Sequence, residues 1–574
     1  MTPPSGPSGG VPAGAPLNVS VVVPVYNPGR YLEACVSSVL GQTMPRQEYE
    51  AIFVDDGSTD GSAEYLDALA AREPNVRVLH LPGSGAPGGP RNAGVDAARG
   101  TFVQFLDSDD ELAPDALERL HRMAAANGTD IVLGKFASAS MPRRQDLFRV
   151  TRRRCTLVDT PGLVDGSLGP TKLFRTALLR RHAIRFPEGW RHMEDQLFTI
   201  HAYLRARSFS ILGDAPCYWF NVREDGSNIS HERVDPAVHM AHLGEIVDLV
   251  ERAAPPGELR DRIVRRFYRA EALARLNETT YLDQDPDYQA ALFAAIRDFA
   301  RAKVPQRLDA DLGIVTALRS SLVRRGRQAE TVELAERARA VDVRAVAGSP
   351  RWRGGRLIVP FEAWLARSAD DPFVVVERDG RFVLDPTFTS GIAERPVAIA
   401  DPTRSARATA ILREPESVLE WILPSTSSVE LVDVGTLDGG RCLRPTIRGS
   451  ITVDPEHVGP EFQRLAPGTW DLLVRLASLG IERTSLVVLD PGPGPAEGRR
   501  PAPAPQPALL GRPARFVVPS VGPSRGLVVH VGAARDEPWP APPSDPAAAP
   551  LGRSLALRRA ALLGPPPELE LLLP

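Results

Sequence analysis

The sequence is poor in cysteine, in net charge and in long apolar runs. Only four cysteines occur among 574 residues, far apart and with no paired spacing, at Cys35, Cys155, Cys217 and Cys442. This spacing indicates neither a zinc site nor a disulfide framework, and it favours a reducing compartment. The formal net charge of -3 argues against nucleic acid as a partner, since such proteins usually carry a strong basic surplus. No apolar run reaches the about 18 residues that a membrane-spanning helix needs.

The N-terminal segment has the composition of a disordered tail. Residues 1–16 are rich in Pro, Gly and Ser and lack the basic region and apolar core of a signal peptide. Together with the lack of a membrane span, this predicts a cytoplasmic protein. A basic cluster at residues 152–154, preceded by Arg149, leaves open a peripheral association with the inner face of the membrane.

The chain is too long for a single hydrophobic core. With 574 residues, of which 43% are hydrophobic, we expect roughly two to four domains. Runs of β-forming residues alternate with helical periodicity over residues 17–235, which predicts a Rossmann-like α/β domain with a parallel sheet. Apolar residues at helical intervals predict a helical segment over residues 236–340.

The last part of the chain is predicted to be rich in β-structure. Short strand-like runs separated by turns occupy residues 341–455 and 456–574, and Asp379-Gly380 between two apolar runs is a strong hairpin signal. A stretch rich in Pro, Ala and Gly at residues 491–513 is expected to form a long loop. Two tandem β-sandwich-like modules are the simplest interpretation, and such modules either recognise a polymer or hold copies of the chain together.

Clustered acids follow the apolar run at residues 102–106. That run is typical of a buried strand, and Asp107, Asp109 and Asp110 come directly after it. A strand that ends on acids delivers them to the open edge of a sheet, where ligands of α/β folds bind. Packed carboxylates repel one another unless a cation or a proton lies between them, and oxygen ligands favour Mg²⁺ or Mn²⁺. The alternative is a solvated loop that caps the next helix.

Two other predicted strands also end on polar residues. The run at residues 18–25 leads into Tyr26, and the run at residues 51–54 ends on Asp55 and Asp56. Because the carboxyl ends of parallel strands meet at the same edge of a sheet, we expect one site that is assembled from several loops.

Four motifs in a fixed order carry a family resemblance. They are Val-Val-Val-Pro-Val-Tyr-Asn, Val-Asp-Asp-Gly-Ser-Thr-Asp, Pro-Arg-Asn-Ala-Gly and Leu-Asp-Ser-Asp-Asp, which begin at residues 21, 54, 90 and 106. In this order they resemble the nucleotide-binding half of the family 2 glycosyltransferases, which have a GT-A fold. The resemblance continues in later motifs such as Glu194-Asp195 and covers about the first 235 residues.

The resemblance implies a binding site for a nucleotide sugar. A uracil ring offers an N3–H donor between two carbonyl acceptors, so a carboxylate suits the donor and an arginine suits an acceptor. The resemblance also implies that Asp109 ligates Mn²⁺ or Mg²⁺ at the diphosphate. The implied nucleotide-sugar-binding residues are Pro24, Tyr26, Asp55, Asp56, Arg91, Asp107, Arg223 and Ser227.

Inverting sugar transfer needs a base that takes the proton of the acceptor hydroxyl. The resemblance implies that Asp195 is this base and that Glu194 supports it. Adjacent carboxylates in a partly apolar setting raise each other's proton affinity, which suits a base. The competing interpretation is that the two acids only cap a helix that runs through Phe198.

The resemblance therefore implies a metal-dependent, inverting glycosyltransferase. The domain order, in which a GT-A domain is followed by helical and tandem β modules, resembles that of the poly(ribitol-phosphate) N-acetylglucosaminyltransferases of wall teichoic acid. That similarity implies a UDP-sugar donor, N-acetylglucosamine as the sugar and the hydroxyls of a cell-surface polymer as the acceptor. It leaves open a homo-oligomer held by the β modules. The alternatives are a capsular or exopolysaccharide glycosyltransferase acting on a lipid-linked glycan, and a non-catalytic carbohydrate-binding scaffold.

Overall fold

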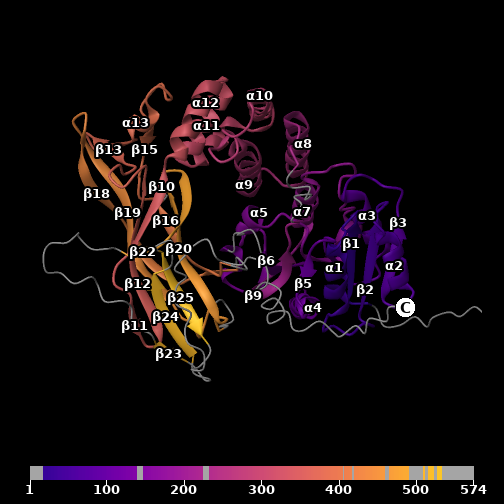
Figure 1. Cartoon of the computed structure of the whole chain (residues 1–574). Helices are drawn as coiled ribbons and strands as arrows, with labels where there is room; N and C mark the ends of the chain where they lie inside the picture. Colours follow the sequence, from indigo (N-terminus) through magenta and orange to yellow (C-terminus); the bar gives the residue numbers. More distant parts are fainter. Residues whose placement is uncertain are drawn as a thin grey trace, which may run out of the picture.

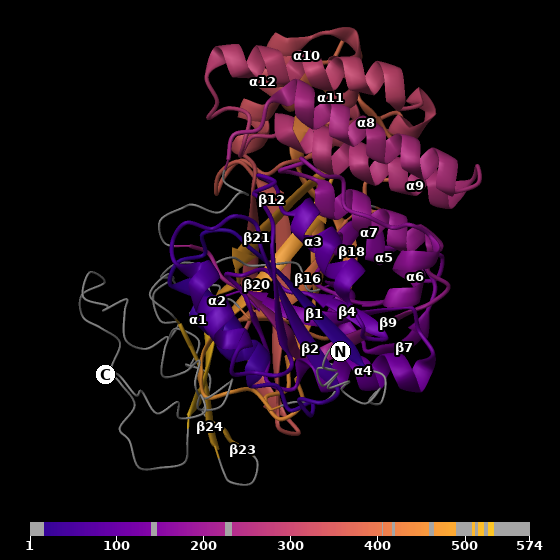
Figure 2. The same cartoon turned by 90° about the vertical axis from the view of Figure 1, so that its right-hand side faces the viewer.

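The chain folds into an α/β domain, a helical segment and a β-rich region (Figures 1 and 2). The computed structural model describes residues 17–138, 146–223, 232–404, 406–415, 419–458, 464–489, 508–510, 515–521 and 526–532. The helical segment lies at the top of Figure 1 and reaches from the indigo α/β domain to the orange and yellow strands. The predicted fold class is thereby confirmed. The predicted N-terminal tail lies outside the described residues.

The sheet of the α/β domain carries the strand ends that the sequence predicts. Its nine strands follow the order β3-β2-β1-β4-β8-β6-β9-β5, with β7 paired to β9. Val25 pairs with Asp55 and Asp55 pairs with His80, so β1, β2 and β3 end at the same edge. The strands are β1 (Val19–Val25), β2 (Tyr49–Asp55), β3 (Val76–His80), β4 (Phe102–Phe105), β5 (Glu111–Leu112), β6 (Ile131–Ser138), β7 (Arg152–Cys155), β8 (Leu173–Arg175) and β9 (Phe209–Phe220).

The sheet is parallel only in part, which differs from the prediction. β1 runs parallel to β2 and β4, and β6 runs parallel to β9, but β8 is antiparallel to both of its neighbours. The regular alternation of strand and helix ends at β4, because β5 follows it with no helix between them. The crossovers that force a parallel arrangement are therefore regular only up to β4.

Helix α3 lies close to β1 because one of its residues has no side chain. A Cβ at Gly94 would stand 2.2 Å from Cγ1 of Val22, so a larger residue would push the helix away from the sheet. This close contact fixes the position of Arg91 near the strand ends. The helices of the domain are α1 (Tyr31–Leu40), α2 (Ser62–Ala70), α3 (Gly88–Ala97), α4 (Ala116–Asn127), the 3₁₀ helix η1 (Asp146–Arg149), α5 (Gly162–Gly166), α6 (Thr176–Arg181) and α7 (Glu194–Arg205).

The helical segment packs directly on the α/β domain. Its buried residues, such as Leu243 and Phe267, belong to the same hydrophobic cluster as the strands of the α/β sheet. Asp235 caps the first helix by accepting hydrogen bonds from the backbone N–H groups of Ala237 and Val238. The elements are α8 (Pro236–Ala253), α9 (Glu258–Phe267), the π-helix η3 (Tyr268–Ala272), the 3₁₀ helices η4 (Leu273–Leu276) and η5 (Gln306–Asp311), α10 (Pro286–Lys303), α11 (Ile314–Arg325) and α12 (Gln328–Arg339).

The β-rich region contains two sheets that share one hydrophobic cluster. The first follows the order β15-β14-β13-β19-β12-β10-β22, with β11 and β18 at its sides, and the second follows β17-β16-β20-β25-β24-β23, with β21 paired to β20. The first contains β10 (Asp342–Ala347), β11 (Arg351–Arg353), β12 (Arg356–Ala366), β13 (Val375–Arg378), β14 (Arg381–Leu384), β15 (Ala398–Ile399), β18 (Ser425–Leu437), β19 (Gly440–Val453) and β22 (Val488–Leu489). The second contains β16 (Arg407–Arg413), β17 (Glu420–Ile422), β20 (Gly468–Ser478), β21 (Ile481–Leu486), β23 (Ala508–Leu510), β24 (Arg515–Val521) and β25 (Leu527–Gly532).

Strands of the two sheets alternate along the chain. β16 and β17 precede residue 455 yet belong to the second sheet, whereas β22 follows it and belongs to the first. The division into modules 341–455 and 456–574 stays a prediction, and the described strands favour one unit of two sheets. The hairpin at Asp379-Gly380 is confirmed: both residues have positive φ, 49° and 71°, and join β13 to β14 next to the short helix α13 (Pro386–Thr389). The loop predicted at residues 491–513 lies outside the described residues, except for β23.

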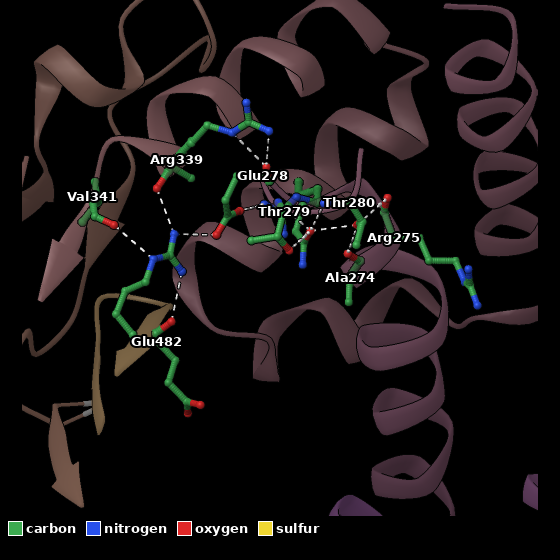
Figure 3. Close-up of polar contacts among 12 residues, drawn as sticks. Ala274, Arg275, Glu278, Thr279, Thr280, Arg339, Val341 and Glu482 are labelled. Carbon is green, nitrogen blue, oxygen red and sulfur yellow. Dashed lines mark hydrogen bonds and ion pairs between the residues drawn. The ribbon is translucent and has the colours of Figure 1, made fainter. Parts of the chain in front are cut away.

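Polar contacts join the helical segment to the β-rich region (Figure 3). Within the helical segment, Arg339 at the end of α12 donates to the carbonyl oxygen of Glu278 at 3.1 and 2.9 Å. Arg483 in β21 reaches across with Nη2 2.5 Å from Oε1 of Glu278 and Nε 3.0 Å from the carbonyl oxygen of Val341. Because the side chains of Glu278 and Arg483 are largely withdrawn from solvent, their contact restrains the orientation of the helical segment and the β-rich region.

The β-rich region also contacts the α/β domain directly. Lys135 in β6 is 1% exposed, and its Nζ lies 3.3 Å from the ring centroid of Trp421 in β17. Burial lowers the pKa of Lys135 to about 7, with Asp214 and Glu420 opposing the shift. Trp219 in β9 belongs to the hydrophobic cluster of the two β sheets. The β-rich region is therefore packed onto the sheet of the α/β domain.

We expect the substitution Trp421→Leu to lower the free energy of unfolding by about 2 kcal/mol, because a desolvated ammonium loses its aromatic partner. Urea unfolding at pH 6, where Lys135 carries its charge, measures this loss. A double-mutant cycle with Lys135→Met isolates the contact, and we expect a coupling energy of similar size. Losses that simply add would show that the ring and the ammonium do not interact.

No helix in the described ranges combines the length and the apolar character required to cross a bilayer. The basic residues 152–154 lie exposed on β7, which pairs only with β9 among the described strands.

Candidate functional site

The carboxyl ends of β1, β2 and β4 bring three predicted segments together. Tyr26 follows β1 and is 58% exposed, so its ring is available to a ligand, whereas Pro24 is buried within the strand. Asn27 connects the first loop to the second, since its amide oxygen accepts a hydrogen bond of 2.8 Å from the backbone N–H of Thr59. One edge of the sheet therefore carries the predicted residues, as expected from the parallel pairing.

Asp55 and Asp56 are buried and already accept hydrogen bonds. Asp55 accepts from the backbone N–H of Ser58 at 3.1 Å and lies 3.2 Å from Nδ1 of His80. Asp56 accepts from the backbone N–H and the hydroxyl of Ser84 at 2.9 and 2.7 Å. A carboxylate has about four acceptor sites, so each retains capacity for one further donor. Their predicted contact with a uracil N3–H stays a prediction.

Arg91 links the acid cluster to the start of α7. Its guanidinium is buried and donates to Asp107 at 2.8 Å and to Glu194 at 2.9 Å. Burial opposes its charge, but Asp107 and Glu194 outweigh this effect and raise the pKa of Arg91. Sequence reasoning assigned Arg91 to the uracil ring and did not find this bridge. No local signal identifies it, because Glu194 lies 103 residues further along the chain.

Asp110 is held by residues from β9 and the segment that follows it. The Tyr218 hydroxyl donates to Asp110 at 2.7 Å, and the backbone N–H of Asn221 donates at 2.7 Å. Burial, followed by the charges of Asp109 and Asp107, raises the pKa of Asp110 well above its usual range. Sequence reasoning missed Tyr218 and Asn221. Only the pairing of β5 with β9 brings them beside the acids.

Asp109 forms an ion pair with Arg223, whose Nε lies 2.8 Å from its carboxylate. Burial raises the pKa of Asp109, Asp107 adds to the shift, and Arg223 opposes it. The sequence prediction placed Arg223 near a diphosphate, and the structure places it beside the acid that would ligate the metal. Ser227, the other residue predicted for that loop, lies outside the described residues.

The acid cluster fits a divalent cation. Burial and the charge of Asp107 raise the pKa of Asp109, so a cation bound to this carboxylate would favour its ionised form. Within the part of the chain that the structure describes, no group of three or more His, Cys, Asp or Glu side chains is arranged to hold a metal ion by itself. Asp109 would therefore hold the ion together with the oxygens of a bound diphosphate, as is usual for Mg²⁺ and Mn²⁺.

Glu194 and Asp195 occupy the first turn of α7. Glu194 is bound to Arg91, and burial raises its pKa while Arg91 opposes the shift. Burial, then the charge of Glu194, raises the pKa of Asp195 to about 7. Met193 precedes the helix with φ of 69° and provides no side-chain cap, and Asp195 accepts at 2.7 Å from the N–H of the adjacent Gln196. A half-buried carboxyl group with a pKa near neutrality suits a general base.

Two family profiles match the chain. The profile of Glycosyl transferase family 2 covers residues 20–211, which contain the acid cluster, Arg91 and Asp195. The profile of the Glycosyl transferase TarS linker domain covers residues 236–335, which make up most of the helical segment.

Individual proteins that are similar to this chain are also glycosyltransferases. Poly(ribitol-phosphate) beta-glucosyltransferase of Bacillus spizizenii is 32% identical over 298 residues, which are 51% of this chain and 46% of the relative. Poly(ribitol-phosphate) beta-N-acetylglucosaminyltransferase TarP of Staphylococcus aureus is 31% identical over 241 residues, which are 41% of this chain and 72% of the relative. The crystal structure of S. aureus TarS 1-349 in complex with UDP-GlcNAc superposes with a TM-score of 0.55 at 27% identity, covering 67% of this chain and 100% of that chain.

The chain spans about half the length of the curated relatives that it matches over the longest stretches. The match to TarP nevertheless covers more than two thirds of that relative, and the family profile covers most of the α/β domain. The chain therefore belongs to the family 2 glycosyltransferases.

Proposed function

We propose that this chain transfers N-acetylglucosamine from UDP-N-acetylglucosamine to hydroxyls of a poly(ribitol-phosphate) polymer with inversion at the anomeric carbon. The observation that carries the proposal is the half-buried Asp195, with a pKa raised to about 7, which follows Glu194 directly and is linked through Glu194 and Arg91 to the acid cluster. The names of the relatives, together with the TarS complex with UDP-GlcNAc, support the donor and the acceptor.

In this proposal the strand ends bind the nucleotide. Tyr26 and Pro24 border the base or ribose, one of Asp55 and Asp56 accepts from the uracil N3–H, and Arg91 contacts a uracil carbonyl oxygen. Asp107 lies at the ribose, and Arg223 with Ser227 contacts the diphosphate. Asp109 would hold Mn²⁺ or Mg²⁺, and the bound ion would offset negative charge on the departing UDP.

Asp195 takes the proton of the attacking hydroxyl. The hydroxyl oxygen forms a bond to the anomeric carbon as the bond from that carbon to the diphosphate oxygen breaks, and UDP leaves with the electron pair. One displacement of this kind inverts the anomeric centre. Glu194 keeps a negative charge beside Asp195 and so raises its proton affinity.

A donor and acceptor screen tests the proposal. The purified chain is incubated with UDP-N-acetylglucosamine or UDP-glucose and poly(ribitol-phosphate), and the product's anomeric configuration is determined by NMR. Both donors are needed because the relatives differ in the sugar that their names give. A β-linked N-acetylglucosamine product is expected. Transfer only to a lipid-linked glycan would favour the capsular alternative, and UDP binding without turnover on any acceptor would favour a scaffold.

We expect Asp109→Ala to weaken UDP binding in the presence of Mn²⁺ by about tenfold to a hundredfold, because the diphosphate then lacks its bridging cation. Titration calorimetry with and without Mn²⁺ measures this loss. Asp298→Ala, at an exposed position of α10, is the control and should bind as the wild type does. Equal affinities for wild type and Asp109→Ala in Mn²⁺ would remove Asp109 from the metal site.

A further inference from the structure

A fully buried lysine lies close to the proposed base. Lys172, just before β8, is 1% exposed. Lysine is almost never buried completely unless it is paired, because its ammonium loses its hydration. Among the described residues, Nζ of Lys172 has one hydrogen-bond partner, the carbonyl oxygen of Gly169. An ammonium has three donors, so this single contact does not account for the burial of the charge.

Lys172 and Asp195 both lie next to Gly169. The ammonium of Lys172 donates to the Gly169 carbonyl, and a Cβ at Gly169 would lie 4.0 Å from Oδ2 of Asp195. The hydroxyl of Thr199, one turn further along α7, donates to the same carbonyl at 3.4 Å. The ring of Tyr203 lies 5.8 Å from Nζ on the other side. The turn at Gly169 is thus held against α7, with the carboxylate of Asp195 and a buried positive charge both close to it.

We infer that Lys172 is a positioning residue for Asp195: it holds the Gly169 turn against the carboxylate and supplies a buried positive charge that favours the ionised base. This inference rests on the proposed function, since it assigns Lys172 a role only if Asp195 takes the proton. Nothing in the reaction requires Lys172 to touch the sugar.

The electrostatics of the pair agree with this geometry. Burial lowers the pKa of Lys172 to about 7, while the charge of Asp195 opposes that shift. The charged groups that face Asp195 are Glu194 on its own helix, Arg91 on α3, Glu271 on η3 and Lys172 ahead of β8. Two of these groups, Glu194 and Glu271, are anions, and their charges favour the protonated form of Asp195. Removal of Lys172 would leave Arg91 as the only cation among them, so the pKa of the base would rise.

The test is the dependence of kcat on pH in Lys172→Met and Lys172→Gln. Methionine removes both the charge and the hydrogen bond, whereas glutamine keeps a donor for the Gly169 carbonyl. We expect the acidic limb of the profile to move upward by about one pH unit in both variants, with kcat restored at alkaline pH. The affinity for UDP should stay unchanged. Lys135→Met is the matched control, because Lys135 is equally buried but faces Trp421, and its acidic limb should match the wild type.

The outcomes separate this inference from the proposed function. Folded Lys172 variants that keep the wild-type limb would overturn the inference, and so would a loss of folding in both variants, which would assign Lys172 to the core alone. Turnover that persists in Asp195→Asn would instead overturn the proposed base. If Asp195→Asn is inactive while the Lys172 variants keep the wild-type limb, only the inference fails.

Discussion

Asp195→Asn is expected to lower kcat by about a hundredfold to ten-thousandfold, because the amide keeps the shape of the side chain but cannot take a proton. Asp195 is half-buried in the first turn of α7, and its pKa of about 7 allows it to exchange protons near neutrality. Because the ionised form is the base, wild-type kcat should fall as the pH drops below about 7, and the variant should lose this acidic limb. Steady-state rates across the pH range, together with UDP affinity, measure both effects.

Glu194→Gln is the matched comparison. Glu194 is bound to Arg91 and acts on Asp195 through its charge, so its loss should lower kcat less and move the acidic limb downward. If Asp195 were only a helix cap, Asp195→Asn would lower thermal stability and leave the turnover of the folded protein intact. That result would move the base elsewhere in the site.

Arg91→Met is expected to lower the free energy of unfolding by about 3 to 5 kcal/mol, because it leaves the buried carboxylate of Glu194 and the half-buried carboxylate of Asp107 without their shared cation. Asp107 and Glu194 both receive hydrogen bonds from Arg91, and the pKa of Glu194 is already raised by burial. Urea unfolding at neutral pH measures the loss. We expect UDP affinity to fall as well, since Asp107 is no longer held in place.

Arg185→Met is the control for this substitution. Arg185 forms an ion pair with Asp96 on the surface of the same domain, and such pairs contribute about 0 to 1 kcal/mol. A loss for Arg91→Met no larger than that of the control would mean that the two carboxylates accept protons or water at little cost. The bridge would then position residues without stabilising the fold.

The local motifs predicted which residues approach the ligand, but they did not reveal how these residues are held. Asp107, Asp109 and Asp110 are adjacent in the sequence, so a strand that ends before them places all three at one edge. Their partners Tyr218 and Arg223 come from β9 and the residues after it, more than 100 positions away. No periodicity or spacing connects such distant segments.

The same distinction applies to the β-rich region. Its strands and the hairpin at Asp379-Gly380 follow from alternating apolar residues and from turn chemistry, both of which act over a few residues. The exchange of strands between the two sheets and the contact of Lys135 with Trp421 do not follow from such signals. They depend on which apolar faces are buried together.

The sequence by itself determined the order of the elements, the edge of the sheet that carries the site and the membership in a glycosyltransferase family, because these depend on neighbouring residues. The tertiary structure decided that Arg91 bridges Asp107 and Glu194, and that Lys172 lies buried near Asp195. A charge can be buried only where the complete fold supplies its partners, and those partners come from segments that meet in space but are far apart in the chain.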